Sequence, residues 1–161
     1  MSTLSRFRKP GGFQQLLALI ETCEPEKQKN LMHLIGTEDP GWAHLVKIKA
    51  LTFERILSWP VEILMEITPH LQDHSIAMVF RMAESSDKYK KNDLHTKWLK
   101  SIPNIKAKSI QNMANSVRFT KEDQTASVIK LLQTVRELQV KGILNFSAFD
   151  PGLDVDIRIT A

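Results

Sequence analysis

The pattern of apolar and polar positions is clearest between Leu51 and Ala83. It predicts three short helices, each with one apolar face, separated at Pro60 and Pro69. Proline ends a helix because it lacks an N–H group and clashes with the preceding turn. The third helix has the most regular spacing, since its apolar residues recur at i, i+3, i+4 and i+7. These are Ile76, Val79, Phe80 and Ala83. Helices this short cannot bury their faces alone, so we expect them to stack as in armadillo-like repeats.

In the part of the chain before Leu51, helical periodicity begins at residue 13 and is absent from residues 1–12. Residues 1–12 are small, basic and contain Pro10-Gly11-Gly12, so we expect a disordered basic tail. Residues 13–49 predict a group of three helices, the second beginning at Pro25 and the third at Pro40. The first helix has an apolar face made of Phe13, Leu16, Leu17, Ile20 and Cys23.

After Ala83 the pattern predicts three further helices. The first starts near Asp87. The second starts at Pro103 and should bury one apolar face, made of Ile102, Ile105, Ile110 and Met113. The third and longest follows a capping box that begins at Thr120, and it should end at Gly142.

The end of the chain predicts no further helix. Residues 143–146 are short and apolar, and we expect a strand-like or extended closure. Residues 147–161 form a tail with alternating apolar positions, which predicts either an edge strand or a loose end, with the loose end favoured. The fold class is therefore predicted to be all-α: an armadillo-like superhelix of short helices, followed by a C-terminal helical bundle, with no sheet.

Composition narrows the functional classes. The chain has 161 residues, of which 42% are hydrophobic and 25% charged, as in ordinary globular proteins. The net charge of +4 permits an acidic partner but does not demand nucleic acid. Cys23 is the only cysteine, which excludes an internal disulfide and a cysteine-based metal cluster. No run reaches the roughly 18 apolar residues of a membrane span, and no apolar signal core is present, so we expect membrane association only through partners.

Catalytic and metal-binding patterns are weak. His70 and His74 are four residues apart, but the HExxH motif is absent and no third ligand has a defined spacing, so we interpret them as surface histidines. No glycine-rich phosphate loop or nucleophile elbow occurs. The carboxylate pairs Glu38-Asp39 and Glu122-Asp123 both suit helix N-termini. We therefore predict a protein that is not an enzyme and that uses neither a cofactor nor a small-molecule substrate.

The strongest charge feature runs from Arg81 to Lys108. It holds eight Lys or Arg and three Asp or Glu, a net charge of 8 − 3 = +5. Three interpretations stay open: a solvated helix face, a protein-binding face, and a nucleic-acid footprint. The nucleic-acid interpretation is the least favoured, because the lysines are spread over two helices with few aromatic residues between them.

Two segments carry a family resemblance. Thr37-Glu-Asp-Pro40 is followed by Ala50-Leu-Thr-Phe-Glu-Arg-Ile-Leu57, and the second segment comprises Val117-Arg-Phe-Thr120 and Val135-Arg-Glu-Leu138 with Gly142-Ile143. In order and spacing these resemble the flagellar motor switch protein FliG over about residues 11–146. The resemblance implies the end of the family's middle domain at 13–49 and its C-terminal domain at 54–146. Between them it implies a hinge at Ala50, Leu51, Thr52 and Phe53.

The resemblance also implies a partner-binding ridge. In the family, alternating charges on the C-terminal domain face the stator protein MotA. Transferred to this chain, the ridge positions are Arg81, Asn104, Gln111, Asn112 and Arg118. Two positions keep a basic residue, whereas the two acidic positions carry amides. A ridge reduced to basic charge can engage only an acidic partner, because charge pairs set orientation and exclude wrong partners.

The leading functional hypothesis is a non-enzymatic FliG-like component of the flagellar rotor or switch, acting in motility and chemotaxis. We expect it to be cytoplasmic and to lie at the inner membrane through its partners. Those partners would be a FliM-like switch protein, a MotA-like stator, or neighbouring copies of the chain. One alternative is a regulatory adaptor that reuses the fold outside the motor. Another, favoured less, is a nucleic-acid-binding helical domain.

Overall fold

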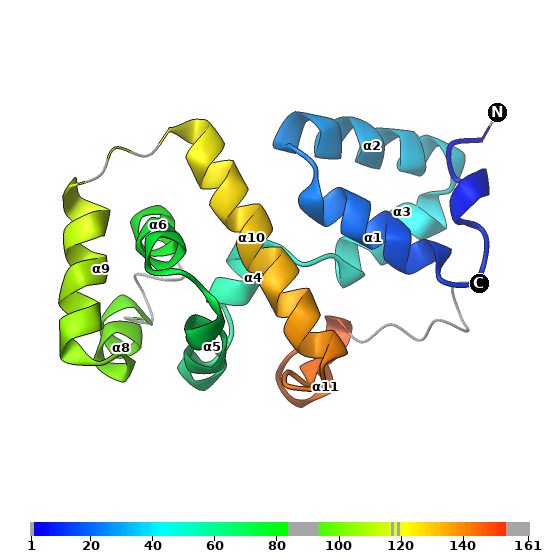
Figure 1. Ribbon diagram of the computed structural model, residues 1–161. Coiled ribbons are helices and arrows are strands. Elements are labelled where there is room, and N and C mark those ends of the chain that lie inside the picture. Colours follow the sequence, from blue (N-terminus) through cyan, green and yellow to red (C-terminus); the bar gives the residue numbers. More distant parts are fainter. Residues whose placement is uncertain (1, 84–93, 117, 119, 154–161) are drawn as a thin grey trace. The chain divides into compact units, whose positions relative to one another are not determined.

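The computed structural model describes residues 2–83, 94–116, 118 and 120–153, and these form helices and no strand (Figure 1). The all-α prediction is therefore confirmed for this part of the chain. The structure divides into two compact units, which are described separately. Unit 1 comprises residues 1–51 and 146–161, and unit 2 comprises residues 52–145.

Unit 1 is built mainly from three helices. They are α1 (Gly12–Thr22), α2 (Pro25–Glu38) and α3 (Pro40–Lys49), with a short 3-10 helix, η1 (Ser5–Phe7), before them. The apolar face expected for α1 is buried, except that Cys23 is half-buried. Phe13 meets Trp42 edge to face with ring centroids 5.4 Å apart, which joins α1 to α3. Such aromatic pairs add specific geometry to the apolar burial.

The expectation of a disordered N-terminal tail is wrong for residues 2–12. Leu4 and Phe7 are buried and belong to the hydrophobic core of unit 1. A Cβ atom on Gly12 would lie 1.8 Å from the carbonyl oxygen of Phe7, so only glycine allows this close approach. Leu4 and Phe7 anchor this segment in the core, although its composition is mainly polar and basic.

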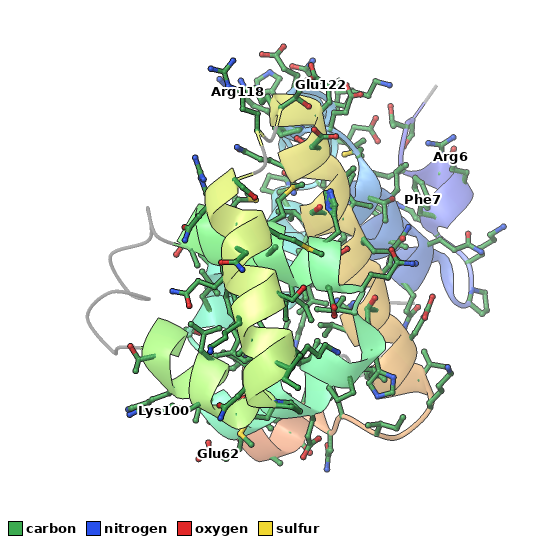
Figure 2. The ribbon with its side chains drawn as sticks, turned by 60° about the vertical axis from the view of Figure 1, so that its left-hand side comes forward. Arg6, Phe7, Glu62, Lys100, Arg118 and Glu122 are labelled. Carbon is green, nitrogen blue, oxygen red and sulfur yellow. The ribbon has the colours of Figure 1, made fainter. Side chains whose placement is uncertain are left out.

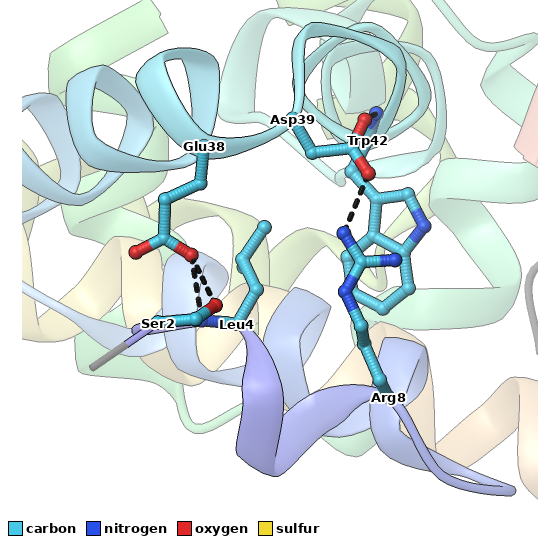
Figure 3. Close-up of polar contacts among 6 residues, drawn as sticks. All are labelled: Ser2, Leu4, Arg8, Glu38, Asp39 and Trp42. Atoms are coloured by element: carbon cyan, nitrogen blue, oxygen red, sulfur yellow. Dashed lines mark hydrogen bonds and ion pairs between the residues drawn. The ribbon is translucent and has the colours of Figure 1, made fainter.

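Polar contacts join this N-terminal segment to the corner between α2 and α3 (Figure 3). The Glu38 carboxylate accepts hydrogen bonds from Ser2 Oγ at 2.6 Å, from the Thr3 backbone N–H at 2.6 Å and from the Leu4 N–H at 3.0 Å. These bonds, first the one from the Ser2 side chain, lower the pKa of Glu38 to about 2. Glu38 therefore binds the N-terminal segment, whereas it was predicted to stabilise a helix N-terminus.

Asp39 has two roles at the same corner. It caps α3 by accepting a hydrogen bond from the Trp42 backbone N–H at 3.0 Å, as predicted. It also accepts a hydrogen bond from Arg8 Nη2 at 2.6 Å, and the Arg8 guanidinium lies 5.0 Å from the centroid of the Trp42 ring. The pKa of Asp39 is lowered, first by the hydrogen bond from Arg8.

The end of the chain also differs from the prediction. Residues 143–145 form neither helix nor strand. A short helix, α11 (Phe146–Phe149), begins at the last residue of the extended closure expected at 143–146 and runs into the predicted tail. A 3-10 helix, η3 (Pro151–Leu153), follows in what was predicted to be a tail, and Leu153 is buried. η3 packs against α3 within unit 1. Val155, Ile157 and Ile159, which raised the possibility of an edge strand, lie outside the described residues.

Unit 2 contains the short helices that the proline pattern predicted. They are α4 (Phe53–Leu57), α5 (Val61–Ile67), η2 (Thr68–His70) and α6 (Asp73–Ala83), followed by α8 (Leu94–Ser101), α9 (Asn104–Ser116) and α10 (Lys121–Val140). α6 lies at the centre of this unit and packs against both α9 and α10. Its residues 76–80 are all buried.

The start and the end of α10 are both as predicted from the sequence. The Thr120 side chain accepts from the Asp123 N–H, and the Asp123 side chain accepts from the Thr120 N–H, which forms the predicted capping box. At the other end, Gly142 has φ = 76° and the Ile143 N–H donates to the Leu138 carbonyl at 2.9 Å. This is a Schellman ending, in which glycine takes the left-handed conformation that other residues rarely adopt.

The Glu38 contacts predict a pH dependence. Since folding lowers the pKa of Glu38 from 4.5 to about 2, its stabilising contribution is present above pH 4.5 and is lost as the pH falls through about 2. Glu38→Gln should lower the melting temperature at pH 7, and the gap from wild type should close between pH 5 and pH 2. Thermal unfolding followed by circular dichroism measures this gap, with Glu26→Gln on α2 as the control for removing one charge. A Glu38→Gln gap that stays constant down to pH 2 would contradict the assignment.

Candidate partner-binding face

The outward face of α9 carries most of the predicted ridge. The helix buries Ile110 and Ala114 against the rest of unit 2. Residues on its opposite side are exposed, and they recur at helical spacing: Asn104, Ile105, Lys108, Gln111, Asn112 and Asn115. This face therefore presents amides, one lysine and one aliphatic side chain.

Arg81 connects α6 to the far end of α9. It is exposed in the last turn of α6, and its Nη1 atom donates to the Ala114 backbone carbonyl at 2.6 Å. The last carbonyl groups of a helix have no partner within the helix, and they carry the negative end of the helix dipole. Arg81 thus binds the end of α9, in addition to being one of the predicted ridge residues.

The other ridge residues fall on or near the same helix. Asn104 begins α9, and Gln111 and Asn112 lie along its exposed face. Arg118 is exposed between α9 and α10, beside residues 117 and 119, which are not described. Figure 2 shows Arg118 near Glu122 at one end of unit 2, with Lys100 at the opposite end. The structure therefore groups the five positions on α6, α9 and the connection after α9.

One prediction about this helix is wrong. Ile105 was expected to be buried with Ile110 and Met113, but it is 88% exposed, and Met113 is only half-buried. Residues five apart on a helix are separated by about 140° around its axis, so Ile105 and Ile110 cannot share one narrow face. Attention to this angle would have identified Ile105 as an exposed apolar residue from the sequence.

α8 extends the basic character of this region. Lys97 and Lys100 are exposed, while Trp98 between them is buried. Trp98 meets Phe80 edge to face at 4.7 Å between centroids and donates from Nε1 to Thr68 Oγ1. Thr68 Oγ1 in turn donates to the Leu64 carbonyl at 2.7 Å. These contacts tie α8 to α6, η2 and α5, and so fix the helix that carries the two lysines.

The predicted hinge residues lie where the two units meet in the sequence. Ala50 and Leu51 are buried at the end of unit 1, and the Leu51 N–H donates to the buried Glu21 carboxylate at 2.9 Å. Thr52 caps α4 by accepting from the Arg55 N–H at 3.1 Å, and Phe53 is half-buried at the start of that helix. The chain passes from unit 1 to unit 2 between Leu51 and Thr52, inside the range named as a hinge.

The remaining candidate groups do not assemble into a reactive site within the described residues. His70 lies in η2 and His74 in α6, and both are exposed. No group of three His, Cys, Asp or Glu side chains in this part of the chain is placed to hold a metal ion. Partial burial raises the pKa of the Cys23 thiol, whose Sγ lies 3.4 Å from the Ile20 carbonyl oxygen. None of the helices described has the length and apolar character needed to span a membrane.

Comparisons with known proteins add no relative. No protein-family model matches the chain, and neither a curated protein nor a solved structure matches it. The FliG resemblance therefore stays a prediction based on the sequence pattern.

Because Arg81 donates a hydrogen bond to the Ala114 carbonyl, truncation of the Arg81 side chain should destabilise the protein. Hydrogen bonds from charged groups stabilise proteins by roughly 1.5–3 kcal/mol, and exposure reduces this, so Arg81→Ala should cost about 1 kcal/mol. Arg118→Ala removes one exposed arginine from the same ridge and should change the free energy of unfolding by less than about 0.5 kcal/mol. Denaturant unfolding monitored by tryptophan fluorescence measures both. Equal effects of the two substitutions would contradict the structural role of Arg81.

Proposed function

We propose that this chain is a non-enzymatic, FliG-like component of the flagellar rotor or switch complex, acting through protein–protein contacts in motility and chemotaxis. The observation that carries this proposal is the ordered sequence pattern of residues 37–57 and 117–143. The proposal is also supported by the exposure of residues to which the FliG resemblance assigns partner binding. Asn104, Gln111 and Asn112 are exposed on one helix, where a partner could reach them.

The charge of the face favours an acidic partner surface. The sequence from Leu94 to Thr120 contains no Asp or Glu, and the exposed residues there include Lys97, Lys100, Lys108 and Arg118. Charges of one sign steer association and exclude partners of the same sign. We therefore propose that the contact of this chain with a stator-like or switch-like protein is made with the acidic part of that protein. The chain would then act in the cytoplasm, at the basal body.

A second candidate is a regulatory adaptor outside the motor. It is favoured by Gln111 and Asn112, which replace the two acidic residues that an alternating ridge requires. An adaptor of this kind would keep the helical scaffold and bind a different acidic surface. Normal swimming in a strain that lacks the gene would favour this candidate over the motor.

The test of the proposed function is capture of the source organism's own switch and stator proteins by the purified full chain. We expect capture of at least one of them, and Lys108→Glu should weaken it because this substitution places an acid at the centre of the α9 face. Lys27→Glu makes the same change on an exposed position of α2 and should leave capture unchanged. Absence of binding to every switch and stator protein, together with normal swimming in the deletion strain, would reject the motor function.

A further inference from the structure

Residues 2–9 bind unit 1 as a turn that makes its own backbone hydrogen bonds. The N–H groups of Ser5, Phe7 and Arg8 each donate to the carbonyl of the residue three positions earlier. Leu4 and Phe7 are also three positions apart, and in a 3-10 helix side chains at this spacing project in the same direction. Both side chains are buried in the hydrophobic core of unit 1. We call residues 2–9 the clasp.

The surface beneath the clasp holds it by its backbone and by one charged side chain. Glu38 accepts hydrogen bonds from two successive backbone N–H groups of the clasp, at 2.6 and 3.0 Å. Asp39 accepts from Arg8, whose guanidinium also lies 5.0 Å from the centroid of the Trp42 ring (Figure 3). Charge-assisted hydrogen bonds and cation–π contacts of this kind add specificity to apolar burial. We call the surface formed by Glu38, Asp39, Trp42 and the adjoining core the corner site.

The corner site is built by contacts that do not involve the clasp. α2 packs against α3, and the edge-to-face contact between Phe13 and Trp42 joins α1 to α3. Asp39 uses one carboxylate oxygen to cap α3 and the other to accept from Arg8. Loss of the Arg8 contact therefore leaves the cap in place. We expect the site to keep its geometry when the clasp leaves it.

We propose that the corner site is a peptide-recognition site and that the clasp is its intramolecular occupant. The partner that fits is a basic protein segment with an apolar residue, an aromatic residue three positions later and an arginine directly after that. Leu4, Phe7 and Arg8 supply this pattern in the clasp. The clasp has three basic residues and no acidic one, so its charge is opposite to that of Glu38 and Asp39. It acts as an autoinhibitory contact, because a partner segment has to displace it.

Displacement is feasible because the polar contacts of the clasp are exposed to water. The hydrogen bonds that Ser2, Thr3 and Arg8 donate to the corner are all exposed, so water can replace them. A segment that brings its own apolar and aromatic side chains restores the burial that the clasp gives up. The attached clasp competes at an effective concentration on the order of millimolar, so a free segment should bind the wild-type chain weakly.

Gly12 offers a substitution that opens the clasp without altering the corner site. A Cβ atom on Gly12 would lie 1.8 Å from the carbonyl oxygen of Phe7 and 2.9 Å from its Cα atom, so Gly12→Ala is incompatible with the docked clasp. Gly12 is the first residue of α1, and alanine is the most favourable residue in a helix. Gly36→Ala on α2 is the matched control, because a Cβ atom there would meet the Ala43 Cβ at 3.9 Å, an ordinary contact.

The experiment measures binding of a fluorescently labelled peptide with the sequence of residues 2–9 to the full chain, by fluorescence anisotropy. Gly12→Ala should bind the peptide about tenfold or more tightly than wild type does, because the competing clasp has been released. Gly36→Ala should bind it like wild type. A peptide that carries Leu4→Ala and Phe7→Ala should bind none of the three chains.

A carboxylate substitution tests the corner site directly. In the Gly12→Ala chain, Glu38→Gln should weaken peptide binding about fivefold, because the backbone N–H groups then meet a neutral acceptor. Glu26→Gln removes one charge from an exposed position of α2 and should leave peptide binding unchanged. Equal effects of these two substitutions would contradict recognition by the corner.

A second route to the open state keeps the proposal falsifiable. Leu4→Ala/Phe7→Ala in the full chain removes the two anchors of the clasp and should bind the unaltered peptide as Gly12→Ala does. If both folded variants bind the peptide no better than wild type, or if the alanine peptide binds equally well, the proposal is overturned. Loss of helical circular dichroism in both variants would overturn it too, because the clasp would then be a part of the fold that cannot be exchanged.

Recognition at the corner site is independent of the proposed function. It concerns unit 1 and a basic segment, whereas the proposed function concerns unit 2 and an acidic partner. Peptide binding by Gly12→Ala supports the corner site whether or not switch or stator proteins are captured. Capture of those proteins would likewise be unaffected by a peptide that fails to bind.

Discussion

The burial of α6 is the constraint on which unit 2 depends. Five successive residues, 76–80, are shielded from water, so this helix needs neighbours on several sides. A surface helix of a globular protein buries only one stripe, whereas a helix that is buried almost all round must lie inside the packing of other helices. α9 and α10 supply that cover, and Phe80 reaches α8 through its edge-to-face contact with Trp98. The bond from Arg81 to Ala114 then fixes the end of α9.

This arrangement separates the residues that stabilise the unit from those that face outward. α9 covers α6 with a stripe around Ile110 and Ala114, and the positions that flank this stripe are half-buried, so only the outward positions of the helix are free of packing demands. Lysine, amides and a single isoleucine occupy them. A protein that works by contacts needs a surface of defined geometry, and a short helix held against a buried helix provides it. This is the physical basis for the proposal that the outer side of α9 binds a partner.

Sequence reasoning was strongest where a local signal determines the local structure. The helix starts at Pro25, Pro40 and Thr120, the stop at Gly142 and the buried face of α1 could all be predicted, because caps and periodicity act within a few residues. The N-terminal segment could not be predicted, because its order depends on Glu38, more than thirty residues away. The burial of Leu153 likewise depends on packing against α3. The exposure of Ile105, by contrast, could have been predicted, because the angle between Ile105 and Ile110 around the helix axis follows from their spacing in the sequence.

Hydrogen exchange of the full chain, measured amide by amide, tests the central claim that α6 holds α9 in place. Amides that open in one cooperative event share one free energy of exchange. We expect the amides of residues 76–80 to be among the most protected in unit 2, and the hydrogen-bonded amides near Ile110 and Ala114 to open with them. If α9 instead exchanged at low free energy while α6 and α10 stayed protected, its outer face would have no fixed geometry. That result would contradict the account.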